Sequence, residues 1–255
     1  MAYTRVIGIL SGKGGVGKTT LTFNLGAAMT DLGMNVAIVD GNVTTPNLSI
    51  HAGLAPGNIS LHDVLKGRVD IYDVMKLLPS GMKIIPASLN VSDLEGTNPM
   101  YLGSRLRDLL GRLDYILIDG APGLGGEAMG VLGASHEIIG VSTPDLPALT
   151  DLLKSIELIK KSDRSYLGTV INMHRNKPYE TKKEHVLSLL EETPILETIP
   201  DDDNMRYALS KRMPVIHFKP HGRSSLKIMK LAAGITGRAY QIPWHRKLRS
   251  YLDFV

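Results

Sequence analysis

The sequence of 255 residues contains no cysteine. This absence excludes disulfide bonds, thiolate metal sites, iron–sulfur clusters and cysteine nucleophiles. The chain also has no apolar run close to the roughly 18–20 residues that are needed to cross a bilayer. Its first apolar run, Val6 to Leu10, is too short for a secretory signal and leads directly into Gly12 and Lys13. These absences predict a cytoplasmic protein.

Internal repeats and low-complexity tracts are absent as well. Hydrophobic residues make up 43% of the chain and charged residues 21%, which argues against a disordered or fibrous protein. The length suits one large domain or two small ones. Because no stretch is long enough to act as a linker, we expect one domain over residues 1–240, followed by a distinct tail over residues 241–255.

The charge is distributed unevenly along the chain. Residues 201–255 contain eleven Lys or Arg and four Asp, a net charge of +7, whereas the whole chain carries +4. A basic C-terminal quarter favours contact with an anionic partner, either membrane lipid or nucleic acid. The alternative is a solvated basic face.

Short apolar runs alternate with helical spacing along most of the chain. We expect strands at residues 4–10, 35–40, 82–86, 115–119, 136–142, 166–172 and 193–199, and helices at residues 98–111, 126–132 and 146–161. Apolar residues from Leu21 to Leu32 predict a further helix, which Gly33 ends. Continuously apolar strands between helices predict an α/β fold of three layers, with a mostly parallel twisted sheet and helices on both faces.

The strongest motif spans Gly12 to Thr19 and fits the phosphate-loop pattern G-x-x-x-x-G-K-[ST] between a strand and a helix. Glycines let main-chain N–H groups converge on a phosphate, and the helix N-terminus adds a favourable dipole. We expect Lys18 to reach the β- and γ-phosphates of a nucleotide, and the Thr19 hydroxyl to bind Mg²⁺.

Lys13 is an additional cation early in this loop, which reads K-G-G-V-G-K-T from Lys13 to Thr19. This loop resembles that of the MinD/ParA family of deviant Walker A P-loop ATPases, most closely the MinD-like members. The resemblance implies that ATP is sandwiched in a homodimer and that Lys13 reaches the nucleotide of the other subunit. It also implies that Asp145 and Asp151 lie near the surface for the dimer and a regulator, although the favoured alternative for Asp151 is an exposed helix aspartate.

Two carboxylates are expected beside the loop. Asp40 and Asp119 each close an expected strand, and the carboxyl ends of parallel strands are where open α/β sheets bind ligands. Both can hold Mg²⁺ through its water shell. By resemblance, Asp119 is the Walker B or switch II aspartate, and Gly123 in the following G-A-P-G segment presents its amide to the γ-phosphate.

Asn42 departs from the family pattern in the expected switch I region. Many relatives carry D-x-D there, whereas this chain has Asp40-Gly41-Asn42. A neutral amide can orient a water molecule but cannot accept its proton. We therefore expect ATP hydrolysis that is slow or depends on a partner.

Three residues later in the chain are candidates for binding the base. Asn172 closes an expected strand with an amide that can pair with an adenine edge. Pro200 and Asp201 resemble the family's proline–aspartate loop, although Asp201 could equally cap the following helix. The candidate catalytic residues are Lys13, Lys18, Asp40, Asn42 and Asp119. The candidate metal ligands are Thr19, Asp40 and Asp119. The candidate ATP-binding residues are Gly12, Lys13, Gly14, Gly15, Val16, Gly17, Lys18, Thr19, Thr20, Gly123, Asn172, Pro200 and Asp201.

The tail carries its own pattern, in which residues from Trp244 to Val255 place apolar side chains on one helical face among basic ones. MinD-like proteins end in such a helix, and this resemblance implies peripheral binding to the inner face of the cell membrane. Asp253 lies near the apolar face and departs from the pattern. The alternative is a final helix packed against the protein's own body.

Two functions fit these features. One is a MinD-like membrane-associated spatial regulator, whose hydrolysis an activating protein stimulates; the other is a ParA-like partition ATPase that binds DNA nonspecifically as an ATP dimer. The apolar face of the tail favours membrane over DNA. A nucleotide-locked scaffold is a lesser alternative, which Asn42 keeps open. Family members that depend on cysteines are excluded, and dethiobiotin- and cobyrinate-type ligases lack a counterpart of Lys13.

Overall fold

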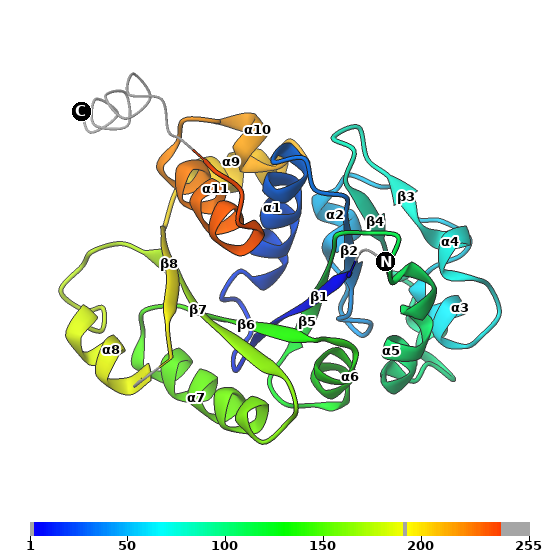
Figure 1. The fold of residues 1–255 in the computed structure, drawn as a ribbon, viewed down its shortest axis with the longest axis horizontal. Coiled ribbons are helices and arrows are strands. Elements are labelled where there is room, and N and C mark those ends of the chain that lie inside the picture. Colours follow the sequence, from blue (N-terminus) through cyan, green and yellow to red (C-terminus); the bar gives the residue numbers. More distant parts are fainter. Residues whose placement is uncertain (1–2, 191–192, 241–255) are drawn as a thin grey trace.

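The computed structural model describes residues 3–190 and 193–240, so the expected tail over residues 241–255 lies outside the described residues. An eight-stranded sheet forms the centre of the described chain (Figure 1). Its strands are β1 (Arg5–Ser11), β2 (Val36–Asp40), β3 (Lys76–Leu77), β4 (Lys83–Ile85), β5 (Tyr115–Pro122), β6 (Glu137–Ser142), β7 (Ser165–His174) and β8 (Ile195–Pro200). The order across the sheet is β3-β4-β2-β5-β1-β6-β7-β8. All neighbouring pairs are parallel except β3 and β4, which are antiparallel.

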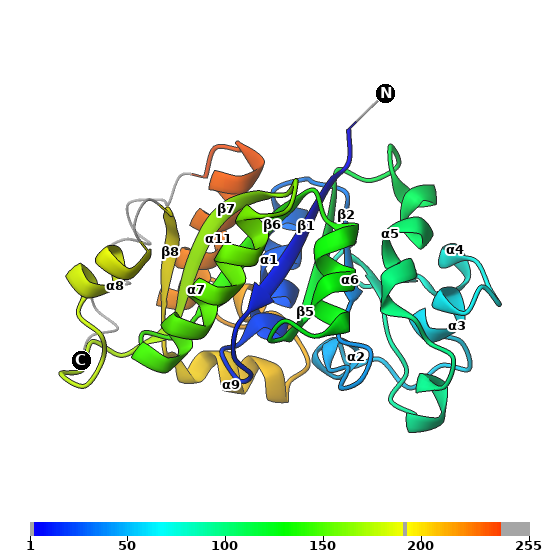
Figure 2. The same ribbon diagram turned by 90° about the horizontal axis from the view of Figure 1, so that it is seen from below.

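Helices cover both faces of the sheet (Figures 1 and 2). They are α1 (Lys18–Asp31), α2 (Leu48–His51), α3 (Leu61–Leu65), α4 (Ile71–Val74), α5 (Leu102–Arg105), α6 (Gly126–Ala134), α7 (Leu146–Lys160), α8 (Lys183–Leu190), α9 (Asp203–Ser210), α10 (Val215–Phe218) and α11 (Arg223–Thr236). Helices α1 and α11 lie on one face, and α6 and α7 lie on the other. This arrangement confirms the expected three-layer α/β fold.

Two apolar cores explain why the central strands are apolar throughout. Ile7 and Ile9 of β1 pack into the core beneath α1 and α11. Val6 and Leu10 pack into the core on the α6 side. Successive side chains of a strand point to opposite faces, so a strand that is covered on both faces needs apolar residues at every position.

The predicted helix over residues 98–111 is wrong as a continuous helix. The structure has three short turns there: a 3₁₀ turn at Pro99–Tyr101, α5 at Leu102–Arg105 and a second 3₁₀ turn at Arg107–Leu109. The apolar spacing on which the prediction was based reflects the burial of these side chains: Leu102, Leu106 and Leu109 all pack into the core. Short turns present these leucines as well as one helix would.

Two further features were not predicted. The edge strand β3 has only two residues, both exposed, and therefore carries no apolar signal. Helix α11 closes the face over α1 by burying residues that include Leu226, Ile228 and Leu231. Within the described residues, no helix is both long and apolar enough to cross a membrane.

Candidate nucleotide site

The phosphate loop joins β1 to α1 and is held between α7 and β7. Gly15 and Gly17 adopt positive φ angles of 80° and 89°, a region that disfavours every residue with a Cβ atom. A Cβ atom at Gly17 would lie 2.4 Å from Nδ2 of Asn172, and one at Gly12 would lie 2.2 Å from the main chain of Asp151. The local packing therefore requires glycine at both positions.

Polar contacts fix the shape of the loop. The Asn172 Nδ2 donates to the Val16 carbonyl at 2.8 Å, and the Ser11 hydroxyl donates to the Lys13 carbonyl at 2.7 Å. The ammonium of Lys18 donates to Ser11 Oγ at 2.8 Å. Lys18 is buried, and this burial lowers its pKa. Within residues 3–190 and 193–240 the only hydrogen bond of this buried ammonium is to a neutral hydroxyl, so the group is suited to an anionic ligand.

Asp40 and Asp119 face each other in register on the neighbouring strands β2 and β5, and both are buried. The Thr19 hydroxyl donates to Oδ2 of Asp119 at 2.6 Å. The main-chain N–H of Leu48 donates to Oδ2 of Asp40 at 3.0 Å, while Oδ1 of Asp40 has no hydrogen-bond partner among the described residues. The predicted pair of strand-end carboxylates is therefore brought together.

The shared burial perturbs both carboxyl groups. Burial raises the pKa of Asp119 to about 6, against the opposing effects of the Thr19 hydrogen bond and the Lys18 charge. Burial, and then the negative charge of Asp119, raise the pKa of Asp40 well above its usual range. Two adjacent carboxylates with one unpartnered oxygen form an environment that a cation would stabilise.

These groups fit Mg²⁺. The nearby donors are all oxygens, namely the carboxylates of Asp40 and Asp119 and the hydroxyl of Thr19, and Mg²⁺ prefers oxygen ligands while retaining several waters. The described residues contain no cluster of three His, Cys, Asp or Glu side chains that could hold a metal ion. When bound, Mg²⁺ would neutralise phosphate charge.

Lys13 lies outside this buried centre. Its ammonium is 3.8 Å from Oδ1 of Asp145, and both side chains are about half exposed. Asp145 is otherwise engaged, because it caps α7 through the N–H of Ala148 at 3.1 Å and accepts a hydrogen bond from the Thr143 hydroxyl. An exposed ion pair at this distance is weak, so Lys13 can exchange Asp145 for a more strongly charged partner.

Asn42 uses its amide within its own loop. Its Nδ2 donates to the Thr45 carbonyl at 2.9 Å, and its Oδ1 accepts from the Thr45 hydroxyl at 3.1 Å. The side chain thus closes the expected switch I segment as a local turn. Its role toward a water molecule remains a prediction.

Sequence reasoning missed two contacts to the same segment. The Oε1 of Glu127, in the first turn of α6, accepts the Thr44 N–H at 2.7 Å. The buried His62 ring lies 3.1 Å from the Val43 carbonyl through Nε2, and its Nδ1 accepts the Ser88 N–H at 3.0 Å. Proximity to the G-A-P-G segment could have singled out Glu127, whereas nothing in the sequence marks His62.

Gly123 adopts a positive φ angle of 78° beside the loop. Its N–H donates to the Ser11 carbonyl at 2.9 Å, so this amide is engaged in the structure. Gly14 and Thr20 also lie beside this centre; the Thr20 hydroxyl is 3.2 Å from Nε2 of His51. A role for the Gly123 amide toward phosphate therefore requires the Ser11 contact to break.

The candidate base residues lie where β7 and β8 end. Asp201 accepts hydrogen bonds from Arg175 at 2.6 Å and from Arg206 at 3.1 Å, and so links the segments that follow the two strands. The cap of α9 is Asp202, whose carboxylate accepts the Asn204 N–H at 2.9 Å, so the alternative of Asp201 as the cap is wrong. Pro200 ends β8, and Asn172 contacts the phosphate loop rather than an open edge.

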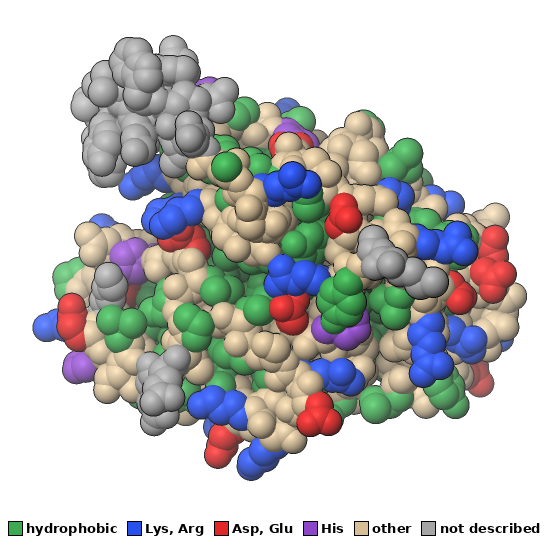
Figure 3. All heavy atoms as spheres, in the orientation of Figure 1, with side chains coloured by type: hydrophobic (Ala, Val, Ile, Leu, Met, Phe, Trp, Pro, Cys, Tyr) green, Lys and Arg blue, Asp and Glu red, His purple; other side chains and the backbone are tan. Residues whose placement is uncertain are grey.

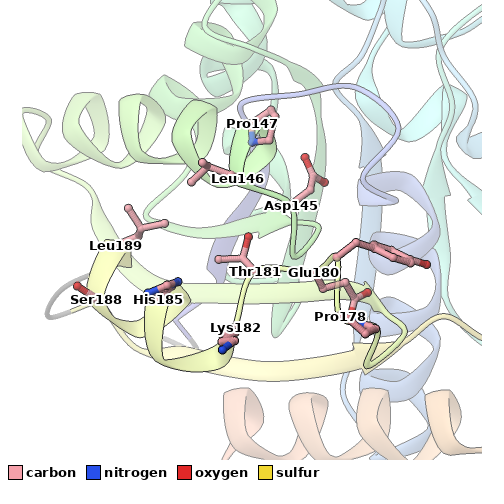
Figure 4. A pocket seen from close by; sticks show the side chains of 11 residues that line it. Asp145, Leu146, Pro147, Pro178, Glu180, Thr181, Lys182, His185, Ser188 and Leu189 are labelled. Atoms are coloured by element: carbon pink, nitrogen blue, oxygen red, sulfur yellow. The ribbon is translucent and has the colours of Figure 1, made fainter.

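A hollow of about 630 Å³ adjoins the Lys13–Asp145 pair (Figure 4). Asp145, Leu146 and Pro147 at the start of α7 form one side of it, and residues 178–189 form the other. The Thr181 N–H donates to the Pro144 carbonyl at 2.8 Å and ties the two sides together. The start of α7 is thus accessible from outside, close to Lys13.

Residues 7–215 match the model of the CobQ/CobB/MinD/ParA nucleotide binding domain, which is more than half of the chain. The chain belongs to this family. It is 31% identical over 245 residues to the septum site-determining protein MinD of Thermotoga maritima, covering 91% of this chain and 88% of that protein. An uncharacterized ATP-binding protein of Methanocaldococcus jannaschii is 29% identical over 247 residues, covering 97% of this chain and 93% of that protein.

Solved structures extend this family similarity to the fold. MinD of Pyrococcus horikoshii, solved in complex with Mg-ADP, superposes with a TM-score of 0.87 at 33% identity. The similarity covers 91% of this chain and 96% of that one. The predicted MinD/ParA family is confirmed, and this chain is a MinD/ParA-family ATP-binding protein with the P-loop fold of MinD.

Proposed function

We propose that this MinD/ParA-family protein is a MinD-like ATPase that binds ATP with Mg²⁺ as a homodimer and acts at a membrane as a spatial regulator. The observation that carries the proposal is that the phosphate loop contains two lysines, of which Lys18 is buried and Lys13 is half exposed. One lysine serves the nucleotide of its own chain, which leaves the other for a second copy.

In this proposal the chain's residues act by position and charge. Lys18 and the loop amides bind the phosphates, Thr19, Asp40 and Asp119 hold the Mg²⁺ waters, and Lys13 approaches the γ-phosphate of the partner. Hydrolysis joins a water oxygen to the γ-phosphorus and breaks its bond to the β–γ bridging oxygen. The two lysines offset the charge on the transferred group.

In this proposal Asn42 keeps the rate of ATP hydrolysis low. The second switch I position offers no carboxylate to take the proton of water, and the amide is occupied with Thr45. Turnover is therefore slow until an activating protein partner binds. After hydrolysis the γ-phosphate no longer bridges the subunits, so the dimer separates.

The proposed destination is the inner face of the cell membrane, reached through the tail over residues 241–255. Two tails in an ATP dimer bind more firmly than one, because the second anchor attaches at a high effective concentration. The second candidate function is that of a ParA-like partition ATPase, because the net charge of +7 in residues 201–255 would also suit DNA.

Replacement of Lys13 by alanine tests the dimer. We expect Lys13→Ala to bind ATP with Mg²⁺ measurably in calorimetry but to form no ATP-dependent dimer in sedimentation. Lys76→Ala is the matched control, since Lys76 is an exposed lysine of β3, at the edge of the sheet. An intact ATP-dependent dimer of Lys13→Ala would contradict the proposed role, and absence of saturable ATP binding by the unaltered protein would remove the function itself.

Liposome flotation and a DNA mobility shift, each with and without ATP, separate the two candidate functions. The proposal expects ATP-dependent flotation with anionic vesicles and no ATP-dependent shift of DNA. The reverse pattern would support the partition ATPase. Binding to neither surface would favour a nucleotide-locked scaffold.

A further inference from the structure

A second hollow, of about 460 Å³, lies at the pole of the molecule opposite the phosphate loop. Residues 100–110 form one wall, residues 133–136 at the end of α6 form the other, and Val6 and Arg164 complete the lining. Helices α5 and α6, which carry these walls, lie side by side in both ribbon views (Figure 2). Val6 is at the amino end of β1 and the phosphate loop follows its carboxyl end, so about 20 Å of strand separate the two sites.

The lining of this hollow is basic. It includes Arg107, His136 and Arg164 and contains no Asp or Glu. The Arg107 side chain forms no ion pair or hydrogen bond within residues 3–190 and 193–240, and the Arg164 guanidinium donates only to the Gly133 carbonyl, at 3.1 Å. The adjacent carboxylate of Glu137 is committed to Arg5 through hydrogen bonds of 2.8 and 2.9 Å. Two guanidinium charges are therefore left uncompensated at one place.

The other polar groups are oriented by the fold. The Val6 N–H donates to Nδ1 of His136 at 3.3 Å, so the proton of the neutral ring is on Nε2 and that atom is a donor. The hydroxyls of Ser104 and Ser135 donate to main-chain carbonyls, at 2.7 Å in each case. Both hydroxyl protons are therefore used within the protein. The donors that remain for a ligand are the guanidinium groups of Arg107 and Arg164 and Nε2 of His136, and no carboxylate of the described residues lines the hollow.

Apolar side chains surround the charged part. Met100, Tyr101 and Leu110 line the same hollow while exposing 57%, 53% and 41% of their surface. Three large apolar residues that remain exposed around one concavity suit the organic portion of a ligand. Arginine forks match phosphate oxygens in geometry as well as charge.

We propose that this hollow binds the phosphate group of a small molecule, with Arg107 and Arg164 holding the oxygens and Tyr101 contacting the organic part. The site is separate from the phosphate loop. It does not depend on the proposed ATPase function.

The test uses full-length protein that carries Lys18→Ala, which weakens phosphate binding at the loop. Inorganic phosphate and phenyl phosphate are titrated by calorimetry, and circular dichroism confirms that each variant is folded. We expect saturable binding with a dissociation constant of about 1 mM or tighter. Arg107→Gln or Arg164→Gln, added to Lys18→Ala, should weaken binding at least about fivefold. The control is Arg68→Gln in the same background, because Arg68 is an exposed arginine that pairs with Asp63 at 3.7 Å and does not line the hollow.

Two outcomes support the site, and they distinguish a phosphate ester from free phosphate as its ligand. Tighter binding of phenyl phosphate than of inorganic phosphate indicates a phosphate ester, and equal binding indicates free phosphate. The proposal is overturned if neither probe saturates, or if binding is the same in the arginine variants as in the Arg68→Gln control.

Discussion

Asp40 and Asp119 are two carboxylates that are buried next to each other at the carboxyl edge of the sheet. Folding removes both from water and places their negative charges side by side, which disfavours the ionised forms. The pair is therefore costly to the fold at neutral pH unless a cation is bound. At the residue scale, these two carboxylates lower the stability of the empty protein and at the same time favour the binding of a cation.

Asp119→Asn should make the nucleotide-free, Mg²⁺-free protein more stable at pH 7. Burial raises the pKa of Asp119 to about 6. Between pH about 4 and 6 the folded state retains a proton that the unfolded state has lost, so the free energy of unfolding falls as pH rises through that window. The variant should gain roughly 1–3 kcal/mol at pH 7 and lose much of this pH dependence. Urea unfolding from pH 4 to 7 measures both; equal stability of the two proteins at pH 7 would contradict the argument.

Asn42→Asp should raise the rate of ATP hydrolysis by about tenfold or more, because a carboxylate can take the proton of the attacking water. The same change removes the donor to the Thr45 carbonyl and should destabilise the protein by about 1 kcal/mol. Phosphate release under saturating ATP measures the rate. Asn47→Asp is a matched control, since Nδ2 of Asn47 donates to the same carbonyl at 3.0 Å. An unaltered rate in Asn42→Asp would refute the proposed role.

At the scale of elements, the connection between β1 and α1 has little freedom. Gly17 is the residue before α1 and adopts the left-handed conformation, while Asn172 of β7 occupies the space where a side chain would go. The phosphate loop is consequently shaped by β7 and α7 as well as by its own sequence. The motif alone explained the glycines by their contact with phosphate. The structure shows a second reason, which is that they pack closely against β7 and α7.

Gly17→Ala should destabilise the nucleotide-free protein by at least about 2 kcal/mol, through the unfavourable φ angle and the contact with Asn172. Thermal unfolding without nucleotide measures this effect apart from any loss of binding. Gly14→Ala, in the same loop, is the control, because the nearest atom to its added Cβ would be 3.9 Å away in Pro122. Equal midpoints for the two variants would show that packing does not constrain the loop.

The central strands could be predicted from sequence patterns, whereas the segment over residues 98–111 and the cap of α9 could not. The central strands were predictable because a parallel sheet covered on both faces requires unbroken apolar runs. The segment over residues 98–111 was mispredicted because the spacing of its leucines indicates that they are buried but not which backbone conformation buries them. Asp202, rather than Asp201, caps α9, while Asp201 binds Arg175, which follows β7, and Arg206 of α9 itself.

At the scale of the whole molecule, the sheet separates the nucleotide edge from the opposite pole, and the described fold is closed by α11. The proposed division at residue 240 predicts that a chain of residues 1–240 still binds ATP and forms the ATP-dependent dimer but no longer floats with anionic vesicles. A full-length Trp244→Ser/Leu248→Ser variant keeps the charges of the tail and separates apolar anchoring from electrostatic attraction. Flotation by the shortened chain would contradict the division.

The phosphate loop, the apolar strands and the family could all be predicted from the amino-acid sequence, because each depends on residues that are close together in the chain. Other distant groups that meet in the folded protein could not be predicted in this way: Lys13 pairs with Asp145, and Glu127 contacts the expected switch I segment. Contacts of this kind depend on strand order and helix placement. No local pattern encodes them, because the same short motifs are compatible with several ways of arranging the sheet.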